Sequence, residues 1–144
     1  MRIEDIDPNS FPELELLIKK ADRAVKTYWY YEYQGMSNMN PENWRLVVKA
    51  CGQLAAVFGD RTCQCPQGME TAIASALKHI KIIECSLEVK EVTEAESNFH
   101  AAMEMLRYEV EHVAEKLHIE LEPEITAPVK KPWWKVLLGK IFGT

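Results

Sequence analysis

The sequence contains few residues that interrupt helices and no apolar run long enough to cross a bilayer. Its 144 residues include six glycines and seven prolines. The longest apolar stretch is far shorter than the roughly 20 residues that a transmembrane helix needs. The first eight residues are acidic and lack an apolar core, unlike a signal peptide. We therefore expect a cytoplasmic protein whose four cysteines are free thiols.

Common catalytic signatures are also missing from the chain. There is no Gly-rich phosphate loop, no nucleophile elbow and no paired-carboxylate motif. Residues 130–144 hold four of the 17 basic residues and no acidic residue, so residues 1–129 carry 13 basic residues against 22 acidic ones. An acidic body suits the phosphate backbone of nucleic acid poorly. We therefore expect a non-enzymatic protein with no cofactor and no nucleic-acid partner for its body.

Apolar residues recur at helical spacing in four segments, and strand-like alternation is absent. The first segment runs from Ser10, a suitable cap, to Gln34. The second begins with Asn40 as its cap and Pro41 in its first turn, and the third begins near Pro66. With short connections and an apolar content of 47%, the sequence predicts an all-α fold, an antiparallel four-helix bundle.

The boundary between the third and fourth helices is less clear in the sequence. The apolar stripe that ends at Leu87 is out of phase with the one that begins at Val92. This shift predicts a turn near residues 88–92, where Thr93 and Glu96 form a capping box. No glycine or proline enforces the turn, so one long bent helix is the alternative.

The helical pattern stops after Ile119. Pro123, Pro128 and Pro132 then indicate an extended, partly stiff linker. We therefore predict a helical bundle over residues 1–119, a Pro-containing linker over residues 120–132 and a short amphipathic helix over residues 133–144.

We call residues 130–144 the C-terminal segment; it is apolar, aromatic and basic. On a helix its large apolar side chains cover one broad side. Trp and Phe favour the interfacial depth of a bilayer, and lysines favour anionic head groups. Docking on its own bundle and binding in a groove of a partner protein are the alternatives. The predicted binding residues are Lys130, Lys131, Trp133, Trp134, Lys135, Leu137, Leu138, Lys140, Ile141 and Phe142.

These features together predict a binding or scaffold protein. The C-terminal segment would recruit it, as a peripheral protein, to an anionic membrane surface or to a partner protein. Homo-oligomerisation would strengthen such weak binding. A second interpretation is a small subunit of a larger assembly, with the C-terminal segment as its docking peptide.

Consecutive aromatic residues occupy the end of the first predicted helix. Residues 28–33 contain five of them, which cannot all face one core. Trp29, Tyr30 and Tyr33 are therefore a candidate patch for protein contacts, unless the following loop covers them.

Arg107 and His112 are separated by four residues. This spacing resembles the metal-independent ribonuclease motif of the HEPN superfamily, whose members are also small helical bundles. The resemblance covers six residues, and Tyr108 stands where the family usually has a polar residue. It implies an alternative function, cleavage of RNA by Arg107 and His112 at a dimer interface. On a helix, Arg107 is also within reach of Glu104 and Glu111.

Two Glu-x-x-His pairs have the spacing found in di-iron bundles. They are Glu109 with His112 and Glu115 with His118. Di-iron sites need one such pair on each of two helices, whereas both pairs here fall on the same helix. We therefore expect these side chains to be solvated on an outer face.

The four cysteines are candidate zinc ligands by residue type alone. Cys51 and Cys85 fall on or near apolar stripes, and we predict that both lie in the core. Cys63 and Cys65 lie in a loop, where they would be exposed and form the only candidate metal or redox pair. A helix separates Cys65 from Cys85, so the sequence predicts no metal site.

Overall fold

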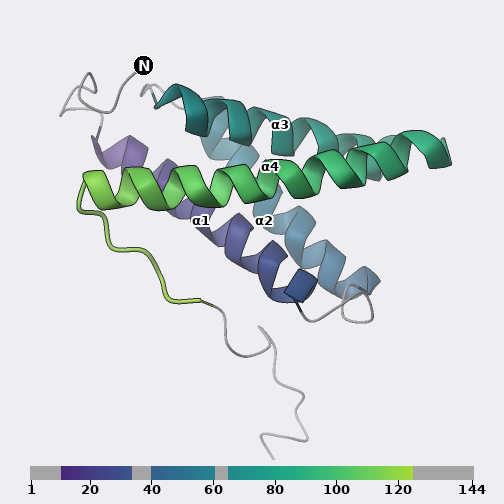
Figure 1. The fold of residues 1–144 in the computed structure, drawn as a ribbon, viewed down its shortest axis with the longest axis horizontal. Coiled ribbons are helices and arrows are strands. Elements are labelled where there is room, and N and C mark those ends of the chain that lie inside the picture. The colour runs from purple at the N-terminus through teal and green to yellow at the C-terminus, as the bar shows by residue number, and fades with distance from the viewer. Residues whose placement is uncertain (1–10, 34–39, 61–64, 125–144) are drawn as a thin grey trace, which may run out of the picture.

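The computed structural model of the protein describes residues 11–33, 40–60 and 65–124 (Figure 1). These ranges contain four α-helices, and no strand occurs in them. The all-α prediction is confirmed, and the packing of the helices is consistent with a bundle. The helices are α1 (Phe11–Tyr33), α2 (Pro41–Asp60), α3 (Gln67–Cys85) and α4 (Val89–Lys116).

The helices associate as two pairs. α1 packs against α2, α3 packs against α4, and the pairs meet mainly between α1 and α4. In Figure 1 the α3–α4 pair runs across the α1–α2 pair, and the two pairs diverge toward the end of α1 and the beginning of α4. The core follows the apolar stripes predicted from the sequence. Among its fully buried side chains are Leu14, Leu17 and Ile18 of α1 and Phe99 of α4. Each such side chain contributes about 1.5–3 kcal/mol of transfer free energy.

The start of α2 follows the predicted capping chemistry. The side-chain oxygen of Asn40 accepts a hydrogen bond of 2.8 Å from the amide of Asn43. The amide of Trp44 donates to the carbonyl of Asn40 at 2.9 Å. Because Pro41 lacks an amide hydrogen, it costs nothing in the first turn. This cap places Trp44 at the first inward position of α2.

α3 and α4 are separate helices, but their junction differs in position from the prediction. Ser86 is extended, and its hydroxyl accepts a hydrogen bond of 3.2 Å from the amide of Glu88. The chain is helical again from Val89, so the turn lies earlier than predicted. The capping-box prediction was wrong: Thr93 lies inside α4 and donates to the carbonyl of Val89 at 2.9 Å. Leu87, predicted to continue the α3 stripe, lies in this turn and is fully exposed.

α4 ends in a hydrogen-bonded C-cap near the predicted position. The amide of Ile119 donates to the carbonyl of Ala114 at 2.9 Å, and the amide of His118 donates to that of Glu115 at 3.3 Å. This is the Schellman arrangement. It places His118 in the left-handed region, with φ of 55°. The cap turns the chain back toward the bundle.

Candidate functional site

A groove of about 850 Å³ opens where the two helix pairs diverge. All four helices line it, and the N-terminal half of α4 provides most of one wall. That volume is near the upper end for ligand pockets, so the groove can hold several side chains. Its lining residues are Tyr28, Glu32, Pro41, Trp44, Ile83, Thr93, Glu96, Ser97, Phe99 and His100.

Aromatic rings form the floor of the groove. Phe99 is fully buried and meets Tyr28 and Trp44 edge to face, with centroid distances of 5.1 and 6.0 Å. The indole nitrogen of Trp44 donates to a carboxylate oxygen of Glu84, which holds the ring in place. Edge-to-face contacts of this kind add about 0.5–1.5 kcal/mol to the burial of each ring. The floor is therefore rigid and apolar.

A tyrosine–histidine–glutamate cluster lies beside the aromatic floor. Tyr28 Oη is 2.9 Å from His100 Nδ1, and Glu32 Oε1 is 3.8 Å from the same nitrogen. Burial raises the pKa of Tyr28 well above its ordinary value of 10, and the charges of Glu32 and Glu96 raise it further. The phenol thus keeps its proton and forms a hydrogen bond with Nδ1 of His100.

The rim of the groove is acidic. Glu32 and Glu96 are exposed and belong to the lining, and no lysine or arginine belongs to it among the described residues. Carboxylates over aromatic rings attract a cation that carries apolar groups. The groove therefore favours a ligand that is both basic and aromatic.

Two residues of the aromatic patch predicted at the end of α1 can be placed in the structure. Trp29 is only 6% exposed, so its assignment to an exposed patch was wrong. His100 of α4 packs against it, with a centroid distance of 4.8 Å, and the loop after α1 lies outside the described residues. Tyr30 is half-buried against the core, and the side chain of Tyr33 lies outside the described residues.

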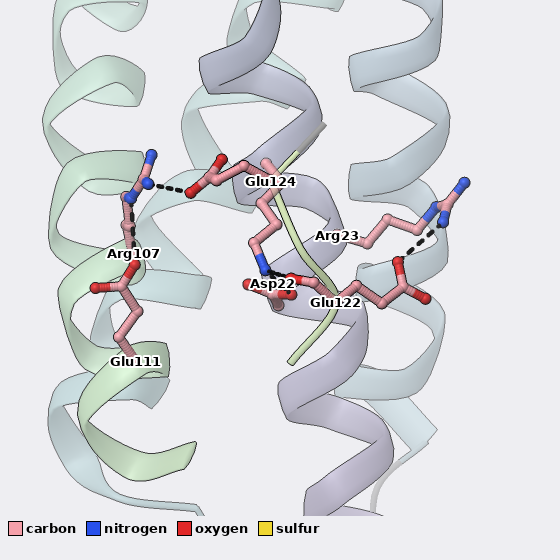
Figure 2. A network of polar contacts seen from close by, with 7 residues as sticks. Asp22, Arg23, Arg107, Glu111, Glu122 and Glu124 are labelled. Carbon is pink, nitrogen blue, oxygen red and sulfur yellow. Dashed lines mark hydrogen bonds and ion pairs between the residues drawn. The ribbon is translucent and has the colours of Figure 1, made fainter. Parts of the chain in front are cut away.

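Residues 119–124 form an extended strap that lies against α1 and contacts both α1 and α4 (Figure 2). Ile119 and Leu121 pack on the core. Arg107 of α4 binds the carboxylate of Glu124. The strap includes the start of the predicted linker, so residues 120–124 lie against the bundle rather than projecting from it.

Cations on α1 hold the other side of the strap. Arg23 lies 3.6 Å from the carboxylate of Glu122, as Figure 2 shows. Lys26 donates to the backbone carbonyl of Glu122. Because this contact involves backbone, it fixes the path of the chain as well as a side chain. The strap therefore determines where the rest of the chain leaves the bundle.

Lys26 also forms a buried ion pair with Asp22, at 2.8 Å. Burial raises the pKa of Asp22, while the hydrogen bond and the charge of Lys26 lower it; the effect of burial is the larger. Sequence reasoning missed this pair. Its signal was an acid and a base four residues apart, directly beside Ala21 and Val25 of the apolar stripe.

Two carboxylates engage Arg107, the first residue of the ribonuclease-like motif. Its guanidinium binds Glu124 and, at 3.3 Å, Glu111, the i+4 partner predicted from the sequence. His112 is exposed and stacks on Tyr108, with ring centroids 6.2 Å apart. The arrangement gives Arg107 a structural role in holding the strap.

One residue of each Glu-x-x-His pair lies at a helix end. A Cβ atom at Gly68, in the first turn of α3, would lie 2.7 Å from the carboxyl carbon of Glu109. The carboxylate of Glu109 is thus beside the positive end of a helix that has no side-chain cap. His118 lies in the C-cap of α4, one residue beyond the helix proper. Within the described ranges, no three His, Cys, Asp or Glu side chains gather as metal ligands do.

The cysteines lie partly where the sequence predicts them. Cys51 is buried as expected. Cys85 is exposed, because it lies in the last turn of α3 beyond the end of the core, so its core assignment was wrong. Cys65 is buried beside the start of α3, and its Sγ lies 3.8 Å from Glu70 Oε2. The prediction that Cys65 is exposed was therefore wrong. Cys63 lies outside the described residues.

The C-terminal segment, with all of its predicted binding residues, lies outside the described residues. Among the four helices, none has the length and apolarity to cross a membrane. Comparison with protein-family models, curated proteins and solved structures gave no match.

Proposed function

We propose that the protein is a non-enzymatic binding or scaffold protein, an antiparallel four-helix bundle that its C-terminal segment recruits to an anionic membrane surface. The observation that carries the proposal is the strap. Arg23, Lys26 and Arg107 hold residues 119–124 on the bundle, so the following residues begin at a fixed point on its surface. A basic and aromatic segment that starts at a fixed point orients the bundle when it binds.

The composition of the C-terminal segment supports a membrane surface as its target. Its four lysines are each worth about 1 kcal/mol near an anionic surface. Trp133, Trp134 and Phe142 have the amphipathic or apolar rings that favour the interface. The acidic body opposes binding to the same surface, so the segment must provide the attraction.

Co-sedimentation with liposomes tests this function. We expect the full chain to bind vesicles that contain anionic phospholipid and a chain lacking residues 129–144 to remain in solution. Raising the salt concentration weakens binding, since the lysine contribution is screened. Equal helical circular dichroism of both chains serves as the control for folding. Equal sedimentation of both chains overturns the membrane proposal and favours a protein partner for the segment.

The ribonuclease alternative makes a different demand on the bundle. It requires Arg107 to face RNA, whereas the described contacts commit its guanidinium to Glu111 and Glu124. Cleavage of RNA by the full chain, abolished by His112→Ala, would establish that alternative against the binding function.

A further inference from the structure

We propose that, away from a membrane, the C-terminal segment docks in the groove of its own bundle. Trp133 and Trp134 would lie on the aromatic floor formed by Phe99 and Trp44, and the lysines would face the acidic rim. The observations that carry this inference are the path of the strap, the length of chain beyond it and the complementarity of the groove.

The strap directs the chain toward the groove. It leaves α4 near Ile119 and reaches Arg107 by Glu124, so it runs back toward the beginning of α4. His100 lies seven residues before Arg107, on the same face of α4. It contacts Trp29 of α1 there and also belongs to the lining of the groove. Continuing in the same direction brings the chain to the groove.

The length of the chain between the strap and the aromatic residues is sufficient. Seven residues of helix correspond to about 10 Å along the axis of α4. Residues 125–132, which join Glu124 to Trp133, can span up to about 26 Å when extended. The linker is therefore long enough to reach the groove. The effective concentration of the C-terminal segment at the groove is in the millimolar range expected for a short linker.

The groove and the segment match in chemistry. The groove presents Glu32 and Glu96 beside an aromatic floor and has no lysine or arginine in its described lining. The segment carries four lysines and no acid, together with two adjacent tryptophans. A second copy of the chain offers the same segment, but the short intramolecular connection favours docking within one molecule at low protein concentration.

Docking in the groove hides the same aromatic side chains that the proposed function uses on a membrane. The groove and the membrane then compete, and the segment is released when an anionic surface offers the more favourable site. This consequence rests on the proposed function; the docking itself does not.

The docking is tested in the absence of lipid by ¹⁵N-edited NMR of the full chain. Trp133→Ala/Trp134→Ala is expected to shift the indole resonance of Trp44 and the amides of Thr93 and Ser97. Amides near the start of α3, such as that of Ala72, serve as the internal control. Unchanged groove resonances would overturn the proposal. Shifts that vanish on dilution would overturn it too, because they indicate docking between two copies.

Vesicle binding then measures the competition. Glu96→Lys removes a rim carboxylate, and Glu94→Lys makes the same charge change at an exposed position of α4 outside the groove. We expect Glu96→Lys to bind anionic vesicles about fivefold more tightly than Glu94→Lys, because it frees the segment. Equal binding by the two variants contradicts the competition. If no variant binds vesicles while the Trp44 resonance still shifts, docking is supported and membrane recruitment fails.

Discussion

Asp22 and Lys26 form a buried ion pair beneath the strap, where burial and charge act in opposite directions. Burial raises the pKa of Asp22 above its ordinary value of 3.8, despite the favourable charge of Lys26. The carboxyl group therefore binds its proton more tightly in the folded state than in the unfolded chain. Its contribution to stability is fully present below the unfolded pKa and is lost as the pH rises through the folded pKa.

The substitution Asp22→Asn removes this titration. We expect the free energy of unfolding of the wild type, minus that of Asp22→Asn, to fall as the pH rises from about 4 to about 6. Urea unfolding curves across this range provide the measurement. Carboxylates that do not interact with Asp22 titrate alike in both proteins and cancel in the difference. A difference that grows with pH would show that Lys26, not burial, controls Asp22.

The thiols should differ in reactivity according to their surroundings. Burial raises the pKa of Cys51 to about 12, and the thiolate is the reactive form. Cys65 is also buried, whereas Cys85 is exposed. We expect iodoacetamide at pH 8 to alkylate Cys85 in the native protein and Cys51 only after unfolding, as peptide mass spectrometry would show. Rapid native labelling of Cys51, with helicity unchanged, would be inconsistent with this packing.

Sequence reasoning at the residue scale identified buried positions better than buried contacts. Leu14, Leu17 and Ile18 are buried as their spacing predicts, because helical periodicity assigns them to one face. The partners of Lys26 and Trp29 could not be predicted, because Glu122 and His100 are distant in sequence. Periodicity describes one helix and contains no information on which side chain of another element covers it.

At the scale of the element, the end of α4 combines a favourable hydrogen-bond pattern with an unfavourable residue. His118 occupies the left-handed position of the Schellman cap, where glycine is the usual residue. A side chain with a Cβ atom is disfavoured in that conformation. We expect His118→Gly to raise the free energy of unfolding by about 0.5–1 kcal/mol, as measured by urea unfolding.

The same substitution at His112 provides the matched control. His112 is exposed inside α4, where glycine weakens the helix. We expect His112→Gly to lower the free energy of unfolding by about 0.5 kcal/mol. If both substitutions destabilise equally, the left-handed cap at His118 is not a feature of the folded protein.

The helices themselves were predictable, because capping residues and apolar stripes are local signals. Asn40 and Pro41 marked the start of α2 correctly. The turn between α3 and α4 was predicted by the change of phase, but its position was not. The end of α3 depends on the extended backbone of Ser86 and on the hydrogen bond between its hydroxyl and the amide of Glu88. No glycine or proline marks this position. Serine is too common outside turns to predict a helix end by itself.

At the scale of the whole molecule, the crossing of the two helix pairs creates the groove. The sequence predicts the number of helices, but their crossing angle depends on how side chains from all four interlock. The groove residues therefore could not be predicted as a group from the periodicity of single helices. The strap was likewise missed, since its residues had been assigned to a linker.

The charge of the whole molecule is divided between an acidic body and a basic C-terminal segment. Residues 1–129 contain 13 basic and 22 acidic residues, so their net negative charge is repelled by an anionic surface. Residues 130–144 are attracted to the same surface. This division should orient the bound bundle away from the membrane. It also explains how one segment can serve two sites, since the acidic rim of the groove and an anionic membrane both attract cations.

Depth-dependent fluorescence quenching tests the membrane-recruitment account most directly. The full chain is mixed with anionic vesicles whose lipids carry bromine at a defined depth, and Trp133→Phe/Trp134→Phe is measured in parallel. We expect quenching of the wild type by lipids brominated near the head groups and little quenching of the variant, whose remaining tryptophans, Trp29 and Trp44, belong to the bundle. Equal quenching of the two proteins, or none in either, would contradict insertion of the terminal tryptophans.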